Sequence, residues 1–199
     1  MNRTERCQET AEAILAATLD VVGEQGLRRV TTRAIADRAG VNEVTLFRRF
    51  GSKMELIRQA LTAKFATFRR DSIEYTGDIE ADLIRLTTDY HATLVGFGPV
   101  ARSLLTEVPF DDDVTEALSP LRVVMAEIVD LLARYQAEGA LHDEPPETLL
   151  PALLGPIIMP IATGGHTLFP QQQLPPFDPT RHIHDFLYGR LASRAPEPR

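Results

Sequence analysis

The chain of 199 residues contains one cysteine and no uninterrupted apolar segment long enough to cross a membrane. Cys7 has no partner for an intrachain disulfide, and the N-terminal residues carry charges where a secretory signal peptide has an apolar stretch. The longest apolar run, Leu149 to Thr163, is shorter than the roughly 20 residues of a membrane helix and is interrupted by prolines. We therefore expect a cytoplasmic protein that does not span a membrane.

Sequence motifs of the common enzyme classes are also missing. The chain has no Gly-rich phosphate loop, no G-x-S-x-G motif and no H-E-x-x-H pair, so we expect neither a catalytic site nor a cofactor. His182, His184 and Asp185 lie close together in sequence, but residues two apart on a helix point away from each other. The run Asp111 to Asp113 lacks the ligand spacing of a calcium loop. We expect no metal site.

The charge of the chain is strongly asymmetric. Residues 1–70 carry 13 Lys and Arg against 8 Asp and Glu, while the remaining residues carry 8 against 20, for a net charge of −7. Nucleic-acid-binding proteins concentrate positive charge where the phosphates lie, and an acidic body keeps DNA away from other surfaces. An acidic chain with a basic N-terminal part is therefore compatible with DNA binding.

Residues 31 to 53, TTRAIADRAGVNEVTLFRRFGSK, have the pattern of two short amphipathic helices joined by a tight turn. Ala36 is small enough for the second helix to cross closely, Gly40 permits the turn, and Leu46 faces the core. A first helix with an apolar face is expected to end at Gly26. These features predict a helix-turn-helix, the motif that places its second helix in a major groove.

The boundaries of these helices carry capping residues. Thr31 or Thr32 can cap the second helix, and Asn42 can cap the recognition helix by accepting from a free backbone N–H. Ser52 and Glu55 have the spacing of a capping box at the start of a fourth helix. That helix continues to about residue 75, with an apolar stripe of Ile57, Leu61, Phe65 and Phe68.

The outward-facing side chains of this segment are the expected DNA contacts. We expect Thr32 and Lys53 to contact phosphates, and Arg33 and Arg49 to lie near base edges with three neighbours on the recognition helix. The complete set is Thr32, Arg33, Asn42, Glu43, Val44, Thr45, Phe47, Arg48, Arg49 and Lys53.

With these residues the first quarter of the chain resembles the TetR family of bacterial transcriptional regulators. The resemblance rests on Gly26, Thr31-Thr32-Arg33, Ile35-Ala36, Ala39-Gly40-Val41, Thr45-Leu46-Phe47, Phe50 and Ser52-Lys53. Phe47 stands where the family commonly has a tyrosine, Asn42 where it often has serine and Val44 where it often has glycine. The family's phenolic contact to a phosphate is therefore absent, and the operator cannot be transferred from a relative.

The rest of the chain has helical patterns without a diagnostic motif. We expect a helix over 78–95, a break at Gly96-Phe97-Gly98-Pro99, a short helix over 100–106, and a long helix over 114–138 that ends at Gly139. A proline-rich helix over 143–163 follows and is stopped by Gly164-Gly165. After a loop over 166–177, Asp178 and Pro179 begin a last helix that runs to about Ala192.

The resemblance implies an all-α fold with two parts. Residues 1–53 are expected to be the helix-turn-helix DNA-binding domain, and residues 54–199 a helical domain that binds an effector and forms a homodimer through its last two helices. In that domain a mostly apolar pocket is expected, with Tyr90, His91 and Arg102 as its polar groups. The expected pocket residues are Phe65, Phe68, Tyr90, His91, Leu94, Arg102, Met125, Ile128 and Met159.

This assignment predicts a ligand-responsive regulator. A homodimer would read a palindromic double-stranded operator with half-sites roughly 34–36 Å apart, and a small, largely apolar effector would release it. Repression is the expected default. The alternative is a DNA-binding module without an effector, which responds to a protein partner or acts architecturally. A rise in melting temperature with ligand would distinguish the two.

Overall fold

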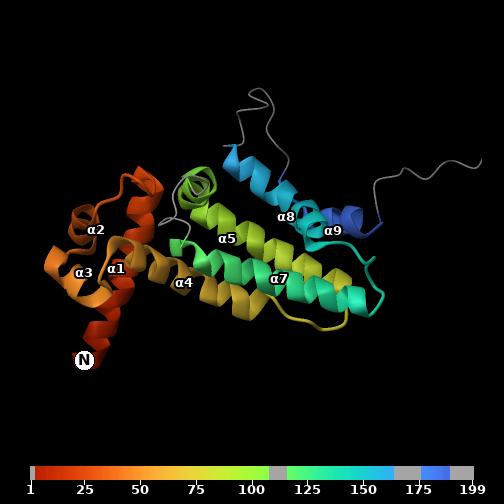
Figure 1. Cartoon of the computed structure of the whole chain (residues 1–199), viewed down its shortest axis with the longest axis horizontal. Helices are drawn as coiled ribbons and strands as arrows, with labels where there is room; N and C mark the ends of the chain where they lie inside the picture. Colours follow the sequence, from red (N-terminus) through yellow and green to blue (C-terminus); the bar gives the residue numbers. More distant parts are fainter. Residues whose placement is uncertain (1–2, 108–115, 164–175, 189–199) are drawn as a thin grey trace, which may run out of the picture.

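The computed structural model describes residues 3–107, 116–163 and 176–188, and the regular structure of these residues is helical. Figure 1 shows one group of helices at the N-terminal end of the molecule, a second group at the other end, and α4 (Lys53–Ser72) running between them. The all-α fold with an N-terminal helix-turn-helix is confirmed. Within the described parts of the chain, no helix has both the length and the apolar character of a membrane span.

The N-terminal end consists of α1 (Arg3–Gln25), α2 (Thr32–Ala39) and α3 (Glu43–Phe50). α1 packs against α2 and α4, and α2 packs against α3. Their shared core is almost fully excluded from solvent, because the apolar faces of all three helices converge on it. Its most deeply buried members include Ile14, Leu27, Ile35 and Leu46.

The larger C-terminal part is built on α4 (Lys53–Ser72) and α5 (Ile79–Glu107). α7 (Ser119–Ala137) packs on α4, while α8 (Pro146–Ala162) and α9 (Pro179–Tyr188) pack on α5. The expected stripe on α4 is buried throughout, including Phe65 and Phe68. Since α5 also packs against α1, the two ends of the molecule share one continuous core.

The expected break in the chain at residues 96–99 is wrong, because α5 continues through Pro99 as a single helix. Proline lacks an N–H donor and its ring crowds the preceding turn, but burial of the apolar residues around it can outweigh these costs. Phe97 is 4% exposed and lies against Phe65 with ring centroids 5.9 Å apart, and Val100 is 5% exposed. Tertiary packing therefore overrides the weak local helix propensity of this segment.

The predicted ends of α7 and α8 agree with the structure to within about one residue. α7 begins at Ser119 and ends before Gly139, whose φ is 75°, and the predicted start at residue 114 lies outside the described residues. α8 begins at Pro146, later than residue 143, and accommodates its three internal prolines. Asp178 caps α9 by accepting from the backbone N–H of Arg181 at 3.0 Å. The run 111–113, Gly164-Gly165, residues 166–175 and the expected end of the last helix near Ala192 lie outside the described residues.

Candidate nucleic-acid interface and helical body

Side-chain caps at Thr31 and Asn42 fix the starts of the two helices at the candidate interface. The hydroxyl of Thr31 accepts from the N–H of Ala34 at 3.1 Å, so Thr31 and not Thr32 is the cap of α2. The side chain of Asn42 accepts from the N–H of Val44 at 2.9 Å and starts α3. Gly40 adopts a φ of 67° between them, a conformation that costs glycine little. The turn predicted from the sequence is therefore present.

The capping box at the start of α4 is only half formed. Ser52 accepts from the N–H of Glu55 at 3.1 Å, as expected. The carboxylate of Glu55 does not return the bond to Ser52 and instead accepts from Arg58 at 2.6 and 2.7 Å and from Gln59 at 2.6 Å. These charge-assisted bonds lower the pKa of Glu55 to about 2, since they favour its ionised form.

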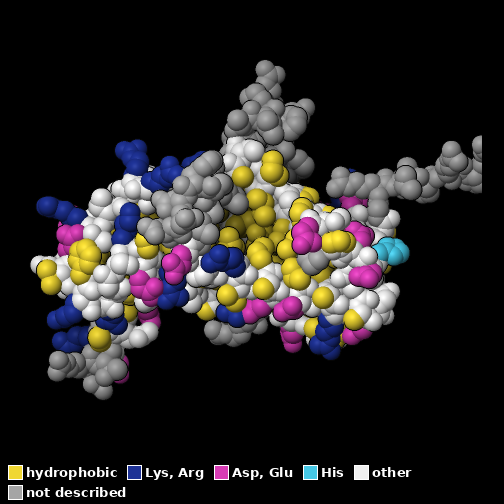
Figure 2. Space-filling view, viewed as in Figure 1, with side chains coloured by type: hydrophobic (Ala, Val, Ile, Leu, Met, Phe, Trp, Pro, Cys, Tyr) yellow, Lys and Arg dark blue, Asp and Glu magenta, His cyan; other side chains and the backbone are white. Residues whose placement is uncertain are grey.

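α3 has one buried side and one open side. Leu46 and Phe50 are 1% and 6% exposed and hold the helix on the core. On the other side Val44 is 70% exposed and Phe47 is 50% exposed, and Arg48 and Arg49 are exposed as well. Figure 2 shows Lys and Arg side chains distributed around this end of the molecule. The open face can therefore approach a polyanion without unpacking the core.

Several predicted DNA contacts are bonded within the chain. The hydroxyl of Thr32 donates to the carboxylate of Glu43 at 2.5 Å, which links the first turns of α2 and α3. The ammonium of Lys53 donates to the backbone oxygen of Val30 at 3.3 Å. Arg49 lies with Nη1 3.2 Å from the sulfur of Cys7. Of the predicted contact residues, Thr32, Glu43 and Thr45 are half-buried, while Arg33 and Asn42 are exposed.

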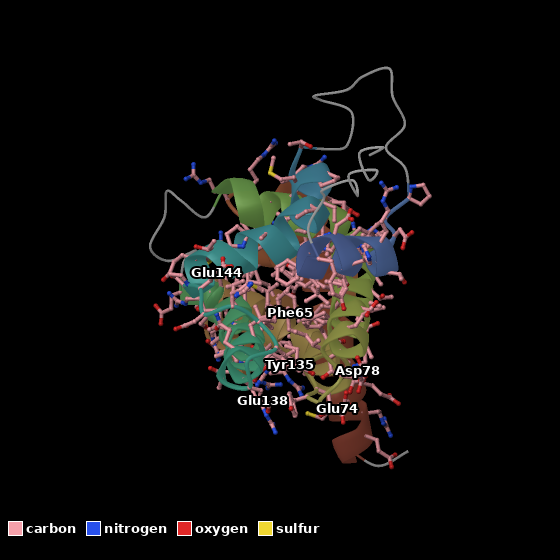
Figure 3. The ribbon with its side chains drawn as sticks, turned by 90° about the vertical axis from the view of Figure 1, so that its right-hand side faces the viewer. Phe65, Glu74, Asp78, Tyr135, Glu138 and Glu144 are labelled. Carbon is pink, nitrogen blue, oxygen red and sulfur yellow. The ribbon has the colours of Figure 1, made fainter. Side chains whose placement is uncertain are left out.

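The predicted effector residues separate into an inner and an outer group. The inner group lies in the core between α4, α5 and α7, where the rings of Phe68 and Tyr90 are 5.8 Å apart; its members are Phe65, Phe68, Tyr90, Leu94 and Ile128, with Met125 half-buried at its edge. Burial raises the pKa of Tyr90 to about 12. Figure 3 shows Phe65 near the middle of the body, surrounded by helices.

The outer group consists of three residues at separate places. His91 stacks on Phe177 with ring centroids 4.8 Å apart, beside α9. Arg102 is exposed, and Met159 on α8 is 53% exposed. Six of the predicted effector residues therefore lie in the core or at its edge, whereas these three side chains lie apart from them.

A hydrophobic hollow opens on the face shown in Figure 2, over α5 and between α7 and α8. The packing of the helices explains its position, because α7 rests on α4 and α8 rests on α5. Half-buried apolar side chains lie on the helices that border it, among them Met125 on α7 and Ile158 on α8.

Sequence reasoning missed a buried polar cluster at the end of the body away from the helix-turn-helix. The carboxylate of Asp82 is fully buried and accepts from the backbone N–H and the hydroxyl of Thr76, each at 2.7 Å, from Arg85 at 2.9 Å and from the hydroxyl of Tyr135. Burial alone would raise the pKa of Asp82, but these bonds together hold it below its ordinary value. Figure 3 shows Tyr135 at this end, near Glu138. An aspartate early in a helix has the pattern of a solvated residue, so no sequence feature predicts its burial.

The histidines near the C-terminus have separate surroundings. His182 contacts the backbone oxygen of Leu153 through Nε2 at 2.7 Å, and it borders two surface grooves of about 460 and 600 Å³ beside α9. His184 is exposed and lies against Tyr188. Among the residues described, no group of three or more His, Cys, Asp or Glu side chains is placed to hold a metal ion.

Comparison with known proteins finds similar sequences for the N-terminal part of the chain. Residues 14–60 match the family model described as bacterial regulatory proteins, tetR family. The uncharacterized HTH-type transcriptional regulator YvkB of Bacillus subtilis is 36% identical over 80 residues, which are 40% of this chain and 42% of that protein. The DNA-binding transcriptional repressor TetR of Mycobacteroides abscessus is 35% identical over 79 residues, 40% of this chain and 41% of that protein. The chain thus spans less than half the length of these relatives.

Solved structures match over nearly the whole chain. The fatty acid degradation regulator FadR of Bacillus halodurans has a TM-score of 0.69 at 17% identity and covers 90% of this chain and 98% of its own. FadR of Bacillus subtilis, in complex with stearoyl-CoA, has a TM-score of 0.68 at 16% identity, with the same coverage of 90% and 98%. At these identities the likeness concerns the fold.

Proposed function

We propose that this chain, a TetR-family protein by its N-terminal domain, is a repressor that binds a palindromic operator as a homodimer and is released by a small effector. The observation that carries the proposal is the open face of α3, which presents Val44, Phe47, Arg48 and Arg49 to a partner while its other side is locked in the core. A helix held in this way enters a major groove as a rigid element. The basic N-terminal part supplies the attraction to phosphates.

The proposed division of labour places the DNA-binding domain at residues 1–53 and the effector and dimerisation domain at 54–199. α4 supports this division, because it begins next to α3 and its Phe65 and Phe68 lie in the interior of the body. A ligand that enlarges this interior would shift α4 and with it α3. Two operator-bound copies require a fixed spacing, so an effector that favours another spacing would release the DNA.

The proposed effector has a large apolar part. Aromatic and aliphatic side chains form the core around Phe65, and an apolar hollow lies on the surface between α7 and α8 (Figure 2). The complex of Bacillus subtilis FadR with stearoyl-CoA makes acyl compounds reasonable first probes. We therefore propose to compare stearate, stearoyl-CoA and CoA alone.

The test uses the full chain and an operator selected from a randomised duplex library. Fluorescence anisotropy would measure operator affinity with each probe, and thermal unfolding would measure binding of the probe to the free protein. We expect stearate or stearoyl-CoA to weaken operator binding and to raise the melting temperature. An effect of CoA alone would contradict an apolar effector, while the absence of any selected sequence would refute the regulator itself.

A variant at the edge of the interior tests the location of the effector. Met125 is half-buried on α7, and Met125→Trp would fill space beside the buried core. We expect this variant to bind the operator normally and to lose the response to the probe. Val123→Trp, at an exposed position on the same helix, is the matched control. An unchanged response in Met125→Trp would place the effector elsewhere.

A further inference from the structure

The open face of α3 carries an apolar patch formed by Val44 and Phe47. The two side chains are 70% and 50% exposed, whereas apolar residues on the inner side of the motif such as Ile35 and Leu46 are at most 1% exposed. Residues three apart on a helix lie on the same side, so Val44 and Phe47 are neighbours. Two adjacent exposed apolar side chains on the proposed recognition helix require an explanation in terms of a partner.

Two polar side chains at the start of α3 already make hydrogen bonds within the chain. Asn42 uses its side-chain oxygen to cap α3 on the N–H of Val44, and Glu43 accepts the hydroxyl of Thr32. Val44 is the second residue of α3, in the first turn, where recognition helices contact base edges. Its side chain has no hydrogen-bonding group, so it can read a base only by apolar contact.

The major groove presents one apolar group to such a side chain, the C5 methyl of thymine. We propose that Val44 is a specificity-determining residue that packs on a thymine methyl in each operator half-site, with Phe47 covering the other side of that methyl. Arg48 and Arg49 follow on the same helix. Their positive charges attract the phosphates on either side of the groove, which holds the apolar patch against the bases. This inference rests on the proposed function, because it requires α3 to lie in the major groove.

The test removes single methyl groups from the DNA. In the operator selected by the full chain, each thymine is replaced in turn by deoxyuridine, which changes no hydrogen-bonding group and no charge. We expect one or two symmetry-related positions at which the wild type loses affinity about fourfold per methyl, the effect of a buried group of that size. A scan in which no position responds would overturn the proposal.

Variants of Val44 test whether this residue contacts the sensitive methyl group. Val44→Ala should bind the unmodified operator about as weakly as the wild type binds the deoxyuridine operator, and should no longer distinguish the two. Val44→Ile should retain the distinction. Val95→Ala makes the same change at another exposed valine, 58% exposed on α5, and should leave both affinities unchanged. Circular dichroism would verify that the surface variants are folded.

The outcomes separate this inference from the proposed function. If no sequence is selected, the proposed function fails; if an operator is selected but Val44→Ala keeps the full sensitivity to deoxyuridine, only the role of Val44 fails. Replacing the sensitive thymine by 5-methylcytosine and by cytosine distinguishes the source of the methyl. Tighter binding to 5-methylcytosine than to cytosine would support contact with a C5 methyl group, and equal binding would contradict it.

Discussion

Side chains on the proposed DNA-binding face differ in how much of their hydrogen-bonding capacity is used within the chain. Lys53 donates one bond to the oxygen of Val30, but an ammonium has three donors and can still reach a phosphate. Thr32 has a single hydroxyl proton, which it gives to Glu43. A phosphate contact by Thr32 therefore requires that the bond to Glu43 be exchanged, whereas Lys53 can bind without rearrangement.

Replacement of single basic residues should distinguish those that contact phosphates from those that read the base sequence. Lys53→Ala is expected to weaken binding to all duplexes and to reduce the slope of log affinity against log salt by about one, because one phosphate contact is lost. Arg33→Ala and Arg49→Ala are expected to change which operator variants are tolerated, at about 1–3 kcal/mol per lost bidentate contact. Anisotropy titrations over a salt series with a panel of operator variants would measure both effects.

The control for this series is Arg122→Ala, which removes one positive charge from an exposed position on α7. It should change neither the salt slope nor the preference among operators by a comparable amount. The assignment of Lys53 to phosphates and of Arg33 and Arg49 to bases would be wrong if Lys53→Ala altered the sequence preference while the two arginine variants left it unchanged.

Tyr135→Phe should destabilise the body by removing a bond to a buried carboxylate. The hydroxyl of Tyr135 donates to Asp82, which is 0% exposed, and a bond to a charged group is worth about 1.5–3 kcal/mol. Urea unfolding at neutral pH would measure the loss. Tyr75→Phe is the control, because its hydroxyl bonds to the exposed Glu138 and its loss should matter less.

Asp82 also makes the free energy of unfolding depend on pH. Hydrogen bonds outweigh burial and keep the pKa of Asp82 in the folded chain below its unfolded value, so its contribution is complete above about pH 4 and is lost as the pH falls through the lowered pKa. The free energy of unfolding of the wild type should therefore exceed that of Asp82→Asn at neutral pH, and the difference should shrink in acid. A difference that grows below pH 4 would mean that the folded-state pKa of Asp82 is raised.

At the scale of whole helices, local signals placed the N-terminal elements and failed on α5. Gly26, Thr31, Asn42 and Ser52 act on groups within four residues, so their roles follow from the sequence. The course of α5 through Pro99 depends on contacts with distant segments, including Phe65 and the backbone N–H of Leu27, which donates to Ser103 at 3.0 Å. No pattern near Pro99 contains that information. The buried role of Asp82 was hidden for the same reason, since Tyr135 is 53 residues away.

Two glycine substitutions should show separately how stability depends on the close packing of α1 against α5 and on the helix propensity of α5. A Cβ at Gly23 would lie 3.2 Å from Val100 and 3.4 Å from Pro99, so Gly23→Leu should force the helices apart and cost about 1–3 kcal/mol. A Cβ at Gly96 would meet no neighbour within 4 Å, and Gly96→Leu should stabilise α5 by about 0.5–1 kcal/mol. Thermal unfolding of the pair would measure this contrast. Destabilisation by Gly96→Leu would indicate that α5 requires flexibility at this position.

Over the whole molecule, α4 mechanically connects the two ends. Its N-terminal half packs with α1, and its C-terminal half is joined to α7 by the ion pair between Arg69 and Glu127. The basic N-terminal part lies at one end and the acidic body at the other, as Figures 1 and 2 show. A second copy bound through the body would therefore present two basic ends to the DNA.

The last two helices are the proposed dimer surface, because they leave apolar groups in solvent. Pro151, Pro156 and Met159 on α8 are exposed, and Tyr188 on α9 is 68% exposed. Leu187 lines a groove of about 460 Å³ with Phe186 and Leu149. An isolated surface of this kind is unusual for a helical protein, and a two-fold mate would cover it.

Leu187→Glu should place a charge in this surface and produce monomers. Analytical ultracentrifugation at micromolar concentration should give the wild type twice the chain mass of 22.1 kDa and the variant that mass once. Operator affinity should fall with it, because one copy makes half of the phosphate contacts. Ala126→Glu, at an exposed position on α7, adds the same charge and should remain a dimer with normal affinity. A wild-type monomer that binds a palindrome tightly would show that the apolar groups on α8 and α9 serve another partner.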